Sequence, residues 1–128
     1  MFGKQKQPPI RTLIGEGTVI TGELRFADGL RIDGEVIGDV IASGEGYSIL
    51  VISEKARVTG KVNAGHVIVN GTVVGPIHSS SLLELQPRAQ ITGDVRYEVL
   101  GRGETIIETG RRQSVTMLPS AESPRSRA

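Results

Sequence analysis

Few side chains in this sequence could take part in catalysis or metal binding. The chain contains no cysteine, which excludes disulfides and cysteine-ligated zinc sites. Its two histidines are His66 and His78, whereas a histidine-ligated zinc site needs about three such ligands. His66 is a candidate general base for acyl transfer. The alternative interpretation is a solvent-facing histidine at a corner of the fold.

Three carboxylates, those of Asp33, Glu35 and Asp39, lie close together in the sequence. Such a group could bind a cation or supply an acid and a base. Glycine-rich calcium repeats would show a recurrent aspartate after Gly-x-Gly, and that recurrence is missing. We therefore interpret the three side chains as part of a solvated outer ladder, and we predict no metal site and no catalytic residue.

Three Gly-x-Gly sequences look like the start of a dinucleotide-binding fingerprint. That fingerprint requires another glycine at a fixed later position. An isoleucine stands there each time: Ile20, Ile49 and Ile106. The sequence also lacks a phosphate-binding GxxxxGK[ST] loop. We therefore predict no cofactor, and the sequence argues against a cytoskeletal protein driven by nucleotide hydrolysis.

The elements that would position these residues are repeats. Leu50–Val62 (LVISEKARVTGKV) returns 33 residues later as Leu83–Val95 (LELQPRAQITGDV), and Ile14–Leu24 is a weaker copy. A second template, Ile32–Val40, returns 37 residues later as Val69–Ile77, so that the two templates alternate. Apolar or small residues occupy every other position, which is typical of β-strands with one buried face.

Glycines mark corners in this pattern about 18 residues apart. Units of this size, made of short strands with glycine corners, are typical of a β-solenoid, whose stacked turns bury their inner faces. We predict an all-β fold, a single-stranded parallel β-helix of about five to six turns. The predicted inward residues are Ile14, Ile20, Leu24, Ile32, Val36, Val40, Ile52, Val58, Val62, Val69, Val73, Ile77, Leu85, Ile91 and Val95.

The charge distribution divides the chain into three parts. Residues 1–11 and 111–128 each carry a net charge of +3, whereas residues 12–110 carry −5. We predict a disordered N-terminal segment, a β-helix over 12–110 with an irregular last turn at 100–110, and a disordered basic tail over 111–128. An acidic body is poorly suited to binding nucleic acid along its length, so we expect no nucleic-acid partner.

The N-terminal segment combines Met1 and Phe2 with Lys4 and Lys6. Each cation near an anionic leaflet contributes about 1 kcal/mol, and a buried phenylalanine adds about 2 kcal/mol. This is a weak membrane anchor that suffices when many copies bind together; the alternative is an ordinary frayed terminus. Because the sequence has neither an 18-residue apolar stretch nor a secretory apolar region, we expect a cytoplasmic protein.

The ends of the predicted solenoid lack the amphipathic helix that caps many soluble solenoids. An uncapped end exposes a strand edge and an apolar surface, which invites another copy to continue the stack. Such end-to-end contacts do not close into a ring, so the expected product is a filament. The candidate end-face residues are Leu13, Ile14, Val19, Ile20, Tyr97, Leu100, Ile106 and Ile107.

Two other kinds of protein fit part of the pattern. A hexapeptide-repeat acyltransferase or a carbonic anhydrase on a left-handed β-helix would keep a strict six-residue step. Here Ile14, Ile20, Phe26 and Ile32 keep that step, but Gly38 breaks it. A solenoid adaptor that binds a partner through its basic tail, without polymerising, is the third class.

The combination of these features resembles the bactofilins. The resemblance covers about 12–100 and the N-terminus, and rests on Val58–Val62, Ile91–Val95, Ile32–Val40 and the Met1-Phe2-x-Lys4 start. It implies a right-handed β-helix that polymerises head to head and tail to tail without nucleotide. It also implies a bacterial scaffold held on the inner face of the cell membrane by the N-terminal segment, where Met1, Phe2, Lys4 and Lys6 match. Clients would be cell-wall and cell-shape proteins. The sequence departs from the family over 101–110, which keeps only fragments of a turn.

Overall fold

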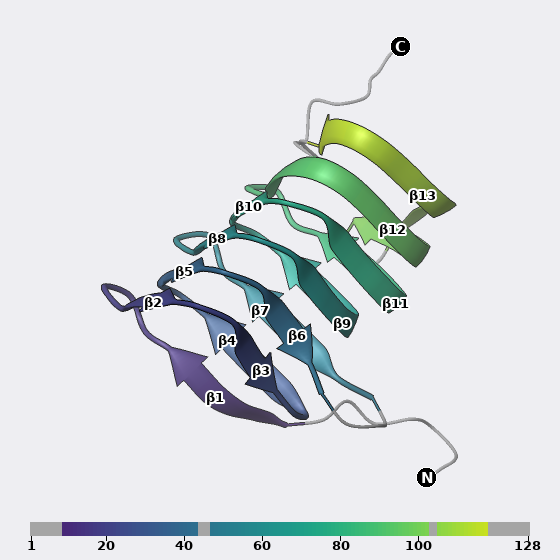
Figure 1. Cartoon of the computed structure of the whole chain (residues 1–128). Helices are drawn as coiled ribbons and strands as arrows, with labels where there is room; N and C mark the ends of the chain where they lie inside the picture. Colours follow the sequence, from purple (N-terminus) through teal and green to yellow (C-terminus); the bar gives the residue numbers. More distant parts are fainter. Residues whose placement is uncertain (1–8, 44–46, 103–104, 118–128) are drawn as a thin grey trace, which may run out of the picture.

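The computed structural model describes residues 9–43, 47–102 and 105–117; for 102 and 105–117 it describes the backbone only. Every regular element in these ranges is a β-strand. Thirteen strands form one sheet that coils around itself in stacked turns, as Figure 1 shows. The predicted all-β solenoid is therefore confirmed.

Each turn of the solenoid crosses three faces, because strands that follow one another in the chain belong to three separate parallel ladders. Face 1 consists of five short strands, and residues on it align without register shifts. Val36, for example, pairs with Ile20 on one side and with Val58 on the other. The strands of face 1 are β2 (Val19–Thr21), β5 (Glu35–Ile37), β8 (Arg57–Thr59), β10 (Thr72–Val74) and the start of β12 (Gln90–Arg102).

Faces 2 and 3 share their longer strands, because several strands bend across the corner between them. Face 2 contains β3 (Leu24–Phe26), β6 (Val40–Ala42) and the first halves of β9 (Val62–Val69) and β11 (Ile77–Leu85). Face 3 contains β1 (Ile10–Ile14), β4 (Gly29–Ile32), β7 (Ile49–Ile52) and the second halves of β9 and β11. β12 pairs with strands on all three faces.

The core is the inside of this coil. All predicted inward residues are buried except Ile20 and Leu24, which pack partly buried against the core. Both lie in the first turn, where neighbouring strands cover them from one side only. The prediction missed a column of large residues on face 3 that align in register from turn to turn: Leu30, Leu50, Val67, Leu83 and Leu100.

The alternation of the two sequence templates has a structural cause at the corner between face 3 and face 1. This corner has alternately four and two residues: 15–18, 33–34, 53–56, 70–71 and 86–89. Each short corner lies against the preceding long one so closely that a Cβ atom on Gly34 would stand 2.4 Å from the Thr18 carbonyl oxygen. On Gly71 it would stand 2.2 Å from the Ser53 carbonyl oxygen. Tight glycine corners therefore have to follow wide ones.

The C-terminal part of the fold differs from the prediction. The segment 100–110 was expected to be an irregular turn, but β12 continues regularly to Arg102. β13 (Thr105–Met117) then runs back antiparallel along β12, across the predicted boundary at residue 110. The physical reason is the free edge of β12, which the returning chain covers by backbone pairing. Across the described ranges, the structure has no helix with the length and hydropathy needed to cross a bilayer.

Candidate assembly surfaces

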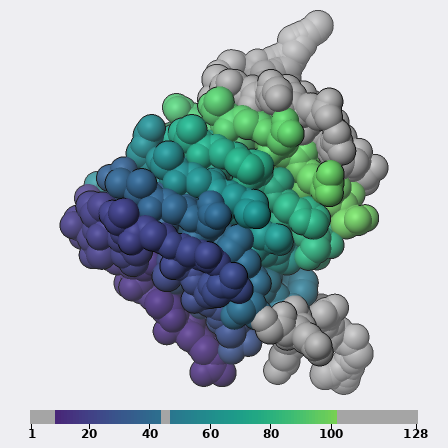
Figure 2. All heavy atoms as spheres, in the orientation of Figure 1, coloured from purple at the N-terminus to yellow at the C-terminus, as the bar shows by residue number. Residues whose placement is uncertain are grey.

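In the part of the chain that the structure describes, the N-terminal end of the solenoid is an open strand edge. Among the described strands, β1, β2 and β3 each have one hydrogen-bonded neighbour, namely β4, β5 and β6. The other edge of each strand therefore presents backbone groups that a further strand could pair with. In the space-filling view the first turn, in purple, forms one end of the stack (Figure 2).

Apolar side chains accompany this open edge. Leu13 on β1 and Val19 on β2, two of the predicted end-face residues, are 59% and 58% exposed. Ile10, which the sequence argument did not single out, is 45% exposed on the same turn. The other two predicted end-face residues of this turn, Ile14 and Ile20, are buried and half-buried because they point into the coil.

The C-terminal end is different, because β13 lies along the edge of the last turn. Tyr97 and Leu100 were expected on an exposed end face, but they are 4% and 2% exposed. Both belong to the core cluster, and the backbone of β12 at these positions pairs with β13. Ile106 and Ile107 belong to β13, and their side chains lie outside the described residues. The predicted membrane segment with Met1, Phe2, Lys4 and Lys6 also lies outside them.

His66 is buried, which makes the solvent-facing interpretation wrong. It lies on the outer side of face 3, between Ile49 and Leu82 in register, and is 4% exposed. Its Nδ1 lies 3.5 Å from the Tyr47 hydroxyl, and its Nε2 lies 3.4 Å from Glu84 Oε1. A tautomer with the proton on Nε2 suits both contacts. Tyr47 belongs to the stretch that links faces 2 and 3, and no repeat in the sequence indicated that this stretch folds over His66.

This corner holds its strands together through buried serines. The Ser48 hydroxyl accepts a hydrogen bond of 2.9 Å from the Gly65 N–H, and the Ser79 hydroxyl donates one of 2.8 Å to the Gly65 carbonyl. β11 runs through Ser79–Ser81 with one register shift. The polar side chains here satisfy backbone groups at an irregular corner, which is a structural role.

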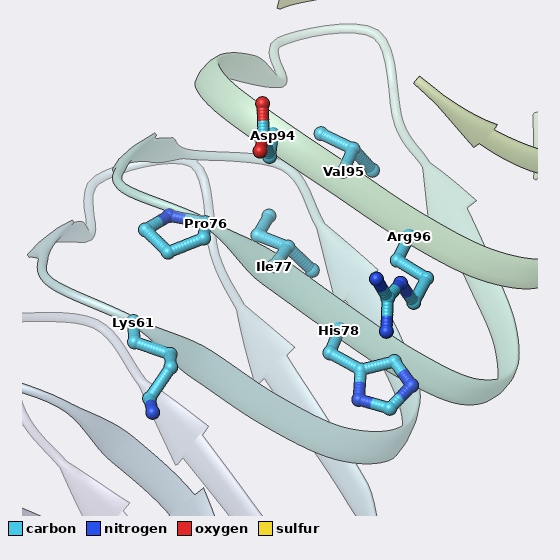
Figure 3. Close-up of a pocket in the computed structure, with 7 residues that line it drawn as sticks. All are labelled: Lys61, Pro76, Ile77, His78, Asp94, Val95 and Arg96. Carbon is cyan, nitrogen blue, oxygen red and sulfur yellow. The ribbon is translucent and has the colours of Figure 1, made fainter. Parts of the chain in front are cut away.

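His78 lies apart from His66, on the outer side of face 2. Together with Arg96 on the next strand and Lys61 at the preceding corner it borders a shallow hollow of about 200 Å³ (Figure 3). Asp94 borders the same hollow, so its charges are mixed. A second hollow, at the corner near Asp33, is not lined by either histidine. The two histidines thus lie on different faces of the solenoid, and His66 lines neither of these hollows.

The three neighbouring carboxylates of the sequence are separated by the fold. Asp33 and Asp39 lie at opposite ends of β5, at two different corners. Asp33 accepts hydrogen bonds from the Ser53 hydroxyl and from Arg31 Nε, the latter at 3.0 Å, and the bond from Ser53 is the main reason why its pKa is lowered. Asp39 Oδ1 accepts one from the Lys61 N–H at 2.9 Å. Within the described ranges, no group of His, Asp and Glu side chains is arranged to hold a metal ion.

The fold and its N-terminal end define a class of protein: a parallel β-solenoid that presents free strand edges at one end. Comparison with known protein families identifies the family within this class. Residues 12–112 match the family Bactofilin, described as polymer-forming cytoskeletal. The chain therefore belongs to the bactofilin family.

Two individual proteins are similar over much of this chain. Bactofilin BacP of Myxococcus xanthus is 29% identical over 85 residues, which cover 66% of this chain and 34% of BacP. The chain thus spans about a third of the length of this curated relative. The crystal structure of a point mutant of bactofilin from Thermus thermophilus superposes with a TM-score of 0.64 at 29% identity, covering 70% of this chain and 94% of that one.

Proposed function

We propose that copies of this chain join end to end into filaments without nucleotide and act as a non-enzymatic scaffold. The observation that carries the proposal is the open edge of β1, β2 and β3 with Leu13 and Val19 exposed on it. A second copy at this edge would pair the free backbone groups and remove both side chains from water. Membership of a polymer-forming cytoskeletal family supports the same conclusion.

The acyltransferase alternative has less support. A general base must come within hydrogen-bond reach of its substrate, about 3 Å. His66 is buried, and the Tyr47 hydroxyl and Glu84 occupy the surroundings of its two ring nitrogens. His78 is half-buried in a shallow hollow that Arg96 and Asp94 also line. If assembly fails in the following experiment, the chain is better explained as an adaptor that does not polymerise.

Purified full-length protein should form filaments in buffer that contains neither ATP nor GTP, visible by negative-stain electron microscopy. The reason is that stacking satisfies strand edges and buries apolar surface, which requires no nucleotide energy. Addition of either nucleotide should leave filament yield unchanged. Monodisperse monomers at every salt concentration tested would contradict the proposal.

We also propose that the filament lies peripherally on the inner face of the bacterial cell membrane and organises cell-wall and cell-shape proteins. Met1 and Phe2 would enter the leaflet, while Lys4 and Lys6 would contact anionic head groups. One such segment binds weakly, but a filament carries many of them side by side. Assembly is thereby a condition for stable membrane contact.

Deleting residues 1–7 should release the filaments from anionic vesicles while leaving assembly intact. Co-sedimentation with vesicles containing phosphatidylglycerol would fall at least about tenfold, because each lost cation contributes about 1 kcal/mol and avidity multiplies the loss. Vesicles of phosphatidylcholine alone provide the control, since the intact filament should bind them weakly. Undiminished co-sedimentation of the shortened filament would remove the membrane part of the proposal.

A further inference from the structure

The two ends of the solenoid are unequal in a way that bears on how it grows. At the N-terminal end, the first-turn strands have an unpaired side as far as the described residues extend. At the C-terminal end, the edge of β12 is paired with β13 along most of its length, from Ile91 with Met117 to Arg102 with Thr105. Figure 1 shows β13 as the outermost strand beyond β12.

The pairing with β13 covers every face of the last turn. On face 1, Thr92 is aligned with Thr116, and on face 2, Arg96 is aligned with Arg111. On face 3, Gly101 is aligned with Ile106. A second copy that continued the sheet at this end would need the same edge of β12, and a strand edge pairs with one neighbour at a time.

β13 is not the next turn of the solenoid. All the other strand pairs of the sheet are parallel, whereas β13 runs antiparallel to β12. β13 therefore runs back along β12 and covers this edge instead of continuing the parallel coil.

The pairing of β13 is also less regular than that between the turns. It contains three register shifts, at Gly93/Val95, Tyr97/Leu100 and Leu100/Gly101. The ladders between β11 and its two neighbours contain one each, and those of face 1 contain none. Each shift leaves ladder groups unpaired, which lowers the cost of removing β13 from β12.

We propose, as an extension of the filament assembly proposed above, that β13 is a displaceable cover on the C-terminal assembly edge. The N-terminal edge is open to a second copy from the start. The C-terminal edge accepts a copy only after β13 leaves β12. Assembly then proceeds in two steps: pairs form first through their N-terminal turns, and displacement of β13 joins the pairs into filaments.

A reversible covalent lock on β13 tests this proposal in the full-length protein. The chain has no cysteine, and Thr92 and Thr116 are aligned partners across β12 and β13, with Thr92 exposed. Aligned residues of antiparallel strands have Cα atoms about 4.5–5.5 Å apart, which suits a disulfide. The double variant T92C/T116C is oxidised, its disulfide is verified by mass spectrometry, and its assembly is compared before and after reduction.

The oxidised protein should stop at dimers in analytical ultracentrifugation, and reduction should restore filaments in the same sample. The single variants T92C and T116C, kept reduced, should assemble like the parent chain. Filaments that form equally well in the oxidised state would overturn the proposal. Failure of every sample to associate, including the parent, would instead contradict the proposed function itself.

A second variant acts in the opposite direction. Val115→Pro removes a backbone donor within β13, opposite Gly93, and should loosen its pairing with β12. Because the cover would then leave more readily, the lag before filament growth should shorten severalfold at equal protein concentration. An unchanged or longer lag, with the circular dichroism of the solenoid preserved, would count against displacement of β13 as the slow step.

Discussion

Replacing Gly60 by alanine should lower the free energy of unfolding more than any exposed substitution in this chain. Gly60 has a φ of 149°, and a Cβ atom on it would stand 2.2 Å from the Gly38 carbonyl oxygen. The contact is with backbone, so no side chain can rotate away to relieve it. Backbone strain of this kind costs about 1–3 kcal/mol, and displacing the neighbouring turn adds to it, so we expect a loss of at least about 3 kcal/mol.

The loss of stability should be large because Gly60 belongs to a column of glycines stacked in successive turns. Gly38 stands in the same relation to Gly22 and Gly75 to Gly60, with Cβ positions 2.1 and 2.2 Å from the carbonyl oxygen of the glycine before. The Gly60 N–H also donates a hydrogen bond of 2.9 Å to the Val74 carbonyl of the following turn. A shift at Gly60 therefore disturbs the turns on both sides.

Substitutions at two other glycines distinguish backbone strain from close packing between turns. Gly17 has a φ of 92°, but no atom lies within 4 Å of its Cβ position, so Gly17→Ala should show strain alone, about 1 kcal/mol. Gly15 has the same free space without a positive φ, so Gly15→Ala should be close to neutral. Urea unfolding followed by circular dichroism measures all three. Equal losses for Gly60 and Gly17 would show that close packing of the turns contributes nothing.

Filament formation should be lost when Val19 is replaced by arginine, while the fold is kept. Val19 is 58% exposed on β2, and its aligned neighbour on β5 is Glu35, which would stand beside the new positive charge. At an interface between two copies, however, the arginine would be buried against apolar surface. Removing this charge from water costs several kcal/mol even beside Glu35, because the desolvation penalty of a buried ion pair can exceed the attraction between its charges. We therefore expect the critical concentration for assembly to rise at least about a hundredfold.

Ile37→Arg is the matched control for Val19→Arg. Ile37 is 43% exposed on the same face, but its strand lies between β2 and β8 and has no free edge. The same change from an aliphatic residue to arginine should therefore leave assembly unaltered. Sedimentation and electron microscopy measure the assembly of both variants, and melting curves verify that both are folded. Comparable loss of filaments in both would show that assembly uses the lateral surface and not the N-terminal edge.

The repeats in the sequence made much of the fold predictable. Each strand alternates inward and outward residues, and each corner recurs, so neighbouring copies of the pattern constrain one another. Val58, Val73 and Ile91 were predicted to point inward for this reason, and all three are fully buried in register. The column that includes Leu50 and Leu83 follows the same alternation, two positions before Ile52 and Leu85, but it was missed because the prediction assigned one inward residue to each face 3 strand, whereas these strands bury two.

The sequence by itself thus determined the solenoid, one inward residue for most of its strands, and the family. Only the tertiary structure showed that the stretch containing Tyr47 covers His66, and that β13 returns along β12. The physical reason is the same in both cases. A repeated pattern specifies how a turn meets the next turn, whereas a segment that occurs once is placed by whatever surface or strand edge the finished stack leaves open.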